Sequence, residues 1–156
     1  MGDELQDAAV VQRQVDAPPA AVWAVLSDGW FYATWVVGAS RVRAVDATWP
    51  GVGSQIHHSF GVWPAVIDDT SEVLAMEPER LLALKARGWP MGEAEVRVEL
   101  EAVGTGTRVT IREDATAGPG QIVPKQLRQA LIAPRNTEAL KRLGYIAAGR
   151  SAAASV

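Results

Sequence analysis

Three ionisable side chains, His58, Asp69 and Glu113, lie where an alternating strand pattern turns them toward an apolar interior. On the strand expected around His58, for example, Ile56 and Phe60 share its face. An ionisable group in such a place costs free energy unless it is paired, and acids and bases with shifted pKa values are typical of sites of proton transfer. We therefore take His58 as a candidate general acid or base, with Asp69 or Glu113 to orient it or to polarise a bound carbonyl group.

Each of these three side chains also has a purely structural explanation. His58 is close to a strand end and can meet solvent there, Asp69 can belong to a turn or bulge, and Glu113 can form an ion pair with an arginine. A shift of one residue in strand register would also turn each side chain to the other face. A catalytic role for these residues is therefore a hypothesis at this point.

The chain offers few residues for a metal or a cofactor. It has no cysteine, and its two histidines, His57 and His58, are adjacent on one expected strand, so they point to opposite faces and cannot share a metal ion. The glycines at Gly51 and Gly53 are too few for a phosphate-binding loop. We expect no metal, no nucleotide and no other cofactor.

Six tryptophans, most of them in expected helices and turns, are the other unusual feature of the sequence. Trp63, Trp89 and Met91 fall on hairpin loops, where apolar side chains have no periodic reason to be buried, which favours a place at the mouth of a pocket. Trp35 suits a core position as well as a pocket, and scattered exposed aromatic residues occur on any protein. The candidate ligand-binding residues, from the apolar sheet face, these loops and the last helix, are Trp35, Ile56, Phe60, Trp63, Ile67, Leu84, Trp89, Met91, Val98, Ile111, Leu127, Leu131 and Asn136.

The composition is that of an ordinary globular domain without a basic surface. Of the 156 residues, 48% are apolar and 21% are charged, and the net charge is -3. Neither nucleic acid nor an anionic lipid surface is therefore an expected partner. No apolar run reaches the ~18 residues that a membrane-spanning helix needs, and the acidic N-terminus lacks a signal core. We expect a cytoplasmic protein with no membrane insertion.

A sheet and a long helix are needed to position these side chains. Residues 8–15 are expected to form a first strand, followed by two short helices near residues 18–26 and 30–35. From residue 38 to 114 the apolar residues alternate, and clusters of glycine and proline divide the segment into six strands. Residues 94–100 show the pattern best, because apolar and charged residues alternate strictly there and leave one face of the sheet to solvent.

Residues 121–149 form the expected final helix, whose apolar stripe changes side along its length. If the 3.6-residue period runs straight through, the apolar residues before Pro134 lie roughly opposite those after it. We therefore expect a kink or a restart of the helix at Pro134, and a frayed tail over residues 150–156.

The polar residues of this helix follow from the same assignment. With Leu127 and Leu131 facing inward, Arg128 points into solvent, and Asn136 is the polar residue that the change of side turns inward. Arginines on helix surfaces usually serve solubility, so a role for Arg128 or Arg135 as an anchor for a ligand carboxylate is the less favoured interpretation.

The order of elements is strand, two short helices, six strands and one long helix. A seven-stranded antiparallel sheet with one apolar face must curve around a single long helix to cover that face. We therefore expect one α+β domain over residues 1–156, with an ordered core at about 8–149. A sheet this strongly curved leaves a largely apolar cavity between itself and the helix.

Short motifs at turns and core positions accompany this order of elements. They are Val15 to Trp23, Gly51-Val52-Gly53-Ser54, Glu77-Pro78-Glu79-Arg80-Leu81 and Gly106-Thr107-Arg108-Val109-Thr110-Ile111. With these motifs the chain resembles the SRPBCC superfamily over about residues 8–149, and most of all its small bacterial polyketide cyclase/dehydrase and lipid-transport group, relatives of START domains and the birch-pollen allergen. The resemblance implies a helix-grip fold in a single START-like domain, and it specifies fold far better than activity.

The resemblance leaves three functions open, since the superfamily includes lipid and steroid carriers, aromatase/cyclases and chaperone co-activators. The first is the binding of a small hydrophobic ligand, such as a lipid, a steroid or an aromatic polyketide-like molecule, in the cavity. The second is a cofactor-independent cyclase or dehydrase, in which His58 acts with Glu113 or Asp69 in an aldol-type cyclisation or dehydration. The third is a protein-interaction module whose interior is filled by its own side chains. We favour the first, in a monomer or weak homodimer whose partner is a small hydrophobic molecule.

Overall fold

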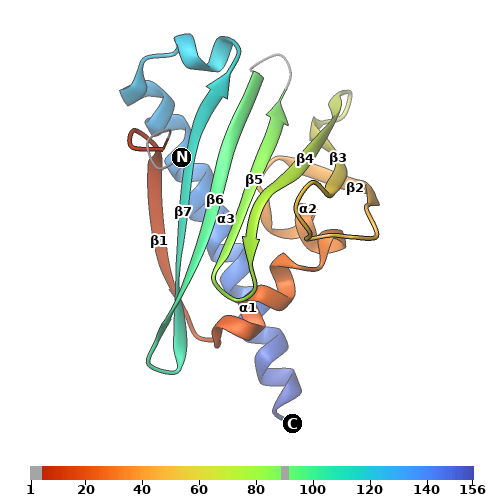
Figure 1. Cartoon of the computed structure of the whole chain (residues 1–156), viewed down its shortest axis with the longest axis vertical. Helices are drawn as coiled ribbons and strands as arrows, with labels where there is room; N and C mark the ends of the chain where they lie inside the picture. The colour runs from red at the N-terminus through yellow and green to blue at the C-terminus, as the bar shows by residue number, and fades with distance from the viewer. Residues whose placement is uncertain (1–4, 89–91) are drawn as a thin grey trace.

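The computed structural model describes residues 5–88 and 92–156, which form one curved antiparallel sheet and a long helix (Figure 1). The strands are β1 (Ala9–Val15), β2 (Ala39–Val45), β3 (Gln55–Val62), β4 (Ala65–Glu77), β5 (Leu81–Gly88), β6 (Gly92–Val103) and β7 (Gly106–Ala117). The helices are α1 (Pro19–Leu26), η1 (Gly29–Phe31), α2 (Tyr32–Trp35), η2 (Pro119–Ile122) and α3 (Lys125–Ala154). The strand order is β1-β7-β6-β5-β4-β3-β2, so the first strand pairs with the last. The predicted α+β fold, with short helices between the first two strands, is confirmed.

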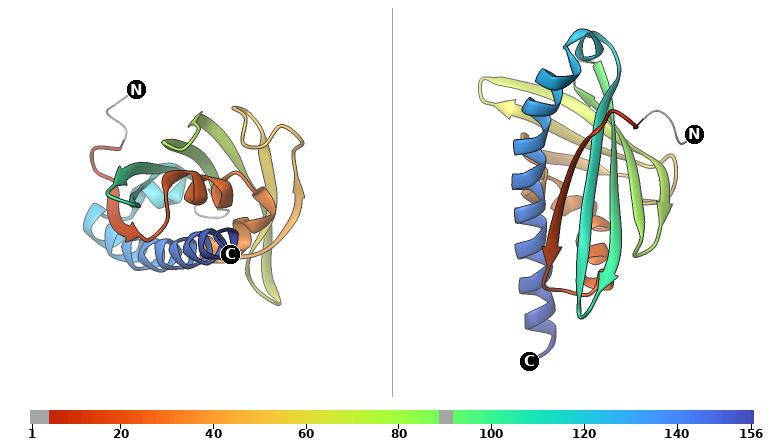
Figure 2. Two further views of the ribbon diagram at one scale, coloured as in Figure 1. Left: turned by 90° about the horizontal axis from the view of Figure 1, so that it is seen from below. Right: turned by 90° about the vertical axis from the view of Figure 1, so that its left-hand side faces the viewer.

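The strands sort their side chains between the two faces of the sheet as the alternation predicts. On β6, Val98 and Leu100 are buried, whereas Glu99 between them lies on the outer face and pairs with Arg112 of β7. Val98 is in turn the register partner of Ile111, which is also buried. Figure 2 shows the sheet curving toward α3, which runs along its concave side. The apolar face is therefore the face that the helix covers.

The final helix differs from its prediction. It runs without interruption through Pro134, so the expected restart does not occur, and it continues past Gly149, so residues 150–154 belong to the helix rather than to a tail. Leu127 and Leu131, which were expected to face inward, are 54% and 65% exposed. No helix in the described residues, α3 included, is both long and apolar enough to cross a membrane.

The inner face of α3 is a single stripe at helical spacing, which explains the error. Arg128, Ile132 and Arg135 form its first half and line a cavity, and the buried residues that continue the stripe are Asn136, Ala139, Leu140, Leu143, Gly144 and Ala147. Two of the three residues in the first half are charged, so the hydrophobic pattern pointed to the wrong side of the helix there.

The densest part of the core lies where α1 and α2 meet the second half of α3. Val22 and Val25 of α1 and Leu143 of α3 are fully buried against large strand residues. The contact between α3 and β1 is close at Gly144, where a Cβ atom would lie 3.3 Å from Val15 Cγ2. The interior is therefore filled at this end of the sheet, and free space has to lie at the other.

Candidate functional site

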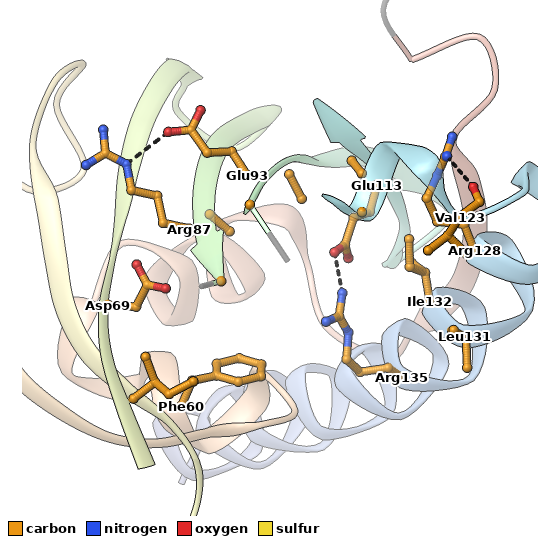
Figure 3. Close-up of a pocket in the computed structure, with 17 residues that line it drawn as sticks. Phe60, Asp69, Arg87, Glu93, Glu113, Val123, Arg128, Leu131, Ile132 and Arg135 are labelled. Carbon is orange, nitrogen blue, oxygen red and sulfur yellow. Dashed lines mark hydrogen bonds and ion pairs between the residues drawn. The ribbon is translucent and has the colours of Figure 1, made fainter. Parts of the chain in front are cut away.

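A cavity of about 400 Å³ lies between the concave face of the sheet and the first half of α3. In Figure 3, Phe60 lies on one side of this cavity, and Leu131, Ile132 and Arg135 of α3 lie on another. Most of its wall is apolar. The residues that line it are Phe60, Ile67, Asp69, Ala86, Arg87, Gly88, Gly92, Glu93, Ala94, Glu113, Ala115, Gly120, Val123, Arg128, Leu131, Ile132 and Arg135.

The size of the side chains on three neighbouring strands explains where the cavity lies. Ala86 of β5, Ala94 of β6 and Ala115 of β7 are register partners, and they form a row of methyl groups across the sheet. The next two rows toward the filled end contain larger side chains, Leu84, Val96 and Glu113, then Leu82, Val98 and Ile111. Because the alanine row leaves the space under α3 unfilled, the cavity forms there.

Glu113 is a buried charge that joins the sheet to α3 beside the cavity. Its side chain is 7% exposed, and its Oε1 accepts a hydrogen bond from Nη2 of Arg135. Its Oε2 accepts one from Nδ2 of Asn136, which is also buried, at 2.7 Å. The ion pair with an arginine that the sequence left open is therefore present, and both carboxylate oxygens have a donor, as a buried carboxylate requires.

Arg128 forms a second ion pair between β7 and α3. Its Nε and Nη2 donate to the two carboxylate oxygens of Asp114 at 2.5 and 3.1 Å, and its Nη1 donates to the carbonyl oxygen of Val123 at 3.0 Å. The Arg128 side chain is 16% exposed, so its predicted position in solvent is wrong. This bidentate pair holds the first turns of α3 over the open end of the sheet.

His58 belongs to a buried hydrogen-bond chain behind the cavity wall. Its Nε2 lies 3.1 Å from Oγ of Ser71, which lies 2.8 Å from the hydroxyl oxygen of Tyr32. Burial raises the pKa of Tyr32 to about 12, although its hydrogen bond with Ser71 opposes the rise. Burial also lowers the pKa of His58 below its usual value, against the influence of nearby Asp69. Within the described residues Nδ1 of His58 is buried without a partner, so a protonated ring would leave an N–H group unsatisfied there.

The lowered pKa of His58 predicts a loss of stability in mild acid. The unfolded chain binds a proton near pH 6.5, whereas the folded chain binds it only at lower pH, so the free energy of unfolding is complete above about pH 6.5 and falls below it. Within this window the loss is up to ~1.4 kcal/mol for each pH unit. Urea unfolding at pH 7.5 and pH 5 should therefore show a larger decrease in the wild type than in His58→Gln.

His57→Gln is the matched control for this experiment. The side chain of His57 is 34% exposed and lies 3.4 Å from Asp46, and the variant keeps the buried His58. Its stability should therefore fall on acidification as in the wild type. An identical fall in the His58→Gln variant would show that the buried imidazole does not cause the loss.

The candidate site residues separate into groups. Those in the cavity wall are Phe60, Ile67, Asp69, Glu113 and Leu131. Those in the packed interior, outside the wall, are Trp35, Ile56, His58, Leu84, Val98, Ile111 and Asn136. Trp63, at the turn between β3 and β4, is 84% exposed, and Leu127 is exposed on the outer side of α3. Trp89 and Met91 lie outside the described residues.

The three candidate catalytic residues do not converge on one point. His58 on β3 and Asp69 on β4 are register partners, but β5 and β6 separate them from Glu113 on β7. Neighbouring strands lie about 4.8 Å apart, so three strand spacings put Asp69 and Glu113 well beyond the reach of one hydrogen bond. His58 also lies outside the cavity wall.

Two features of the wall were missed at the sequence level. The first is the row of alanines, although a small residue at the same end of each alternating strand is a readable signal. The second is the inward position of Arg128 and Arg135. Here the signal was the pair of carboxylates Glu113 and Asp114 at the end of the last strand, because buried carboxylates need cations and the final helix follows directly.

Comparison with known structures supports the fold. Protein NE0264 from Nitrosomonas europaea superposes with a TM-score of 0.72 at 18% identity, covering 97% of this chain and 99% of that one. The di-domain ARO/CYC StfQ from the steffimycin biosynthetic pathway gives 0.71 at 11% identity, covering 96% of this chain and 54% of that one. DynU16 from the dynemicin biosynthetic locus gives 0.66 at 23% identity, with coverage of 92% and 48%. This chain therefore spans about half the length of the last two.

The sequence itself matches one family model, described as polyketide cyclase / dehydrase and lipid transport, over residues 7–144. No curated protein matches it. The matched region runs from the start of β1 into the second half of α3 and so includes every element that builds the cavity. The chain therefore belongs to the polyketide cyclase/dehydrase and lipid transport family.

Proposed function

We propose that the protein binds a small, largely apolar molecule in the cavity between the sheet and α3. The observation that carries this proposal is an apolar space of about 400 Å³, within the range of roughly 300–1,000 Å³ that ligand sites occupy. Two of its buried charged groups already have protein partners, Glu113 with Arg135 and Arg128 with Asp114. Affinity would then come from burial of apolar surface and from shape.

A cyclase or dehydrase function is the second candidate. It is supported by the name of the family, by the ARO/CYC description of StfQ, and by the presence of Asp69 and Glu113 in the cavity wall. Two observations favour binding over chemistry: both oxygens of Glu113 are occupied by donors, and His58 is hydrogen-bonded to Ser71 behind the wall. General acid–base catalysis needs a group within reach of the substrate.

A protein-interaction module with a filled interior is the third candidate from the sequence. It predicts that the protein's own side chains occupy the space between sheet and helix. The cavity weighs against it, and so does the alanine row, which provides no side chain to fill the space.

Filling the cavity should abolish binding without unfolding the protein. In Ala115→Phe a benzyl group replaces a methyl group of the alanine row, so the affinity for the neutral fluorescent probe N-phenyl-1-naphthylamine should fall at least tenfold, equivalent to about 1.4 kcal/mol. The free energy of unfolding should change by about 1 kcal/mol or less, because the added ring enters an existing void.

Ala102→Phe, at an exposed position of the same sheet on β6, is the control and should bind the probe like the wild type. Unchanged binding in Ala115→Phe would show that the probe is held elsewhere. Absence of binding in the wild type, together with no small molecule retained in native mass spectrometry, would count against the proposed function itself.

A further inference from the structure

The charged residues of the cavity wall balance one another. The acidic residues are Asp69, Glu93 and Glu113, and the basic ones are Arg87, Arg128 and Arg135, so the wall has no net charge. Asp114, which binds Arg128 from behind, adds one further negative charge. An anionic group buried here would have no spare cation to compensate it, and an uncompensated buried charge is costly.

Arg135 differs from the other two arginines in how its donors are used. A guanidinium group has five N–H donors, and the described residues accept one hydrogen bond from Arg135, at Glu113. By contrast, Arg128 has all three of its nitrogens engaged with Asp114 and backbone carbonyls. Arg87 pairs with Glu93 at 3.2 Å, and its side chain is 50% exposed.

The position of Arg135 suits it to meet a ligand. Its side chain is 35% exposed and belongs to the cavity wall, and in Figure 3 it extends from α3 toward Glu113. Glu113 is itself held by Asn136, so the guanidinium is fixed before any ligand arrives. A donor that is already in place loses little conformational entropy on binding.

We infer that the ligand is a neutral, mainly apolar molecule that carries a carbonyl oxygen, and that this oxygen accepts a hydrogen bond from Arg135. The inference rests on the proposed binding function and narrows it. Glu113 acts as a positioning residue: it holds the guanidinium in place, and by neutralising its charge it disfavours carboxylates. Ketones, esters, lactones and amides belong to the accepted class, and free fatty acids do not.

Three probes with one two-ring body test the inference: 2-acetylnaphthalene, 2-ethylnaphthalene and 2-naphthoate. Titration calorimetry on the wild type at pH 7.5 should show the ketone binding about tenfold more tightly than the hydrocarbon, with naphthoate the weakest. In Arg135→Met the advantage of the ketone over the hydrocarbon should disappear. Arg142→Met is the matched control on the same helix, since Arg142 is exposed and bonds only to Glu138 among the described residues.

Glu113→Gln gives the sharper result, because it frees the charge of Arg135 and keeps an acceptor for Asn136. The affinity for naphthoate should rise at least tenfold in this variant, while that for the ketone changes little. The infrared stretch of the bound ketone gives a second readout: it should lie at lower frequency in the wild type than in Arg135→Met. If Arg135→Met does not fold, the double variant Glu113→Gln/Arg135→Met replaces it, since it leaves no unpaired buried carboxylate.

The outcomes separate this inference from the proposed function. Equal affinities for ketone and hydrocarbon in the wild type would overturn the role of Arg135 while leaving a binding cavity. Naphthoate as the tightest wild-type ligand would overturn the neutrality of the ligand. Failure of all three probes to bind would instead remove the proposed function on which the inference rests.

Discussion

Replacing Glu113 with alanine should lower the free energy of unfolding by about 3 kcal/mol. The carboxylate is almost fully buried and accepts hydrogen bonds from Arg135 and Asn136. Its removal leaves the buried amide of Asn136 without this acceptor and the guanidinium without its counter-charge. The loss is at the lower end of the range for broken buried pairs because Arg135 stays partly hydrated. The melting temperature should fall by roughly 6–12 °C.

Glu99→Ala is the matched control for this prediction. Glu99 and Arg112 form an ion pair on the outer face of the same sheet, 3.5 Å apart, and both side chains are about 40% exposed. Exposed pairs contribute less than about 1 kcal/mol, so this variant should melt close to the wild type. Equal effects of Glu113→Ala and Glu99→Ala in chemical denaturation would show that Glu113 does not anchor α3.

Leu143→Ala should cost about 3–4 kcal/mol. Leu143 is fully buried on the inner stripe of α3, in the core that α3 shares with α1 and the sheet. Truncation removes apolar contacts and leaves a cavity in a tightly packed region, which cannot collapse without moving the helix. Urea denaturation should show a lower midpoint with an unchanged m-value.

The control for Leu143→Ala also tests the phase of α3. Leu127 is 54% exposed on the outer side of the same helix, so Leu127→Ala should change the free energy of unfolding by less than about 0.5 kcal/mol. If Leu127 faced inward, as the apolar pattern first suggested, both variants would be strongly destabilised. The pair of variants therefore decides which face of α3 contacts the sheet.

The sheet was predictable because its signal is local and periodic. On β6, for example, charged residues such as Glu95, Arg97 and Glu99 alternate with apolar ones, and a period of two has one interpretation in a half-buried strand. Glycine and proline mark the ends of such strands for steric reasons that act within a few residues. The inward positions of His58 and Glu113 followed from this alternation, and both are buried.

The helix was harder because hydrophobicity stops identifying its inner face where that face is charged. Arg128 and Arg135 turn inward because Asp114 and Glu113 wait on the sheet, which a local pattern in the helix does not contain. Leu131 is partly exposed and still lines the cavity. Apolar character alone therefore misplaced the first half of α3.

The sequence by itself determined the order of elements, the two faces of the sheet and the family, because these depend on periodicity and on short motifs that act along the chain. Only the tertiary structure decided which inward residues surround empty space and which are packed. That difference depends on rows of side chains across strands, such as the alanines of β5, β6 and β7, and on ion pairs between β7 and α3. Residues distant in sequence set the local volume and charge, so no single strand or helix carries this information.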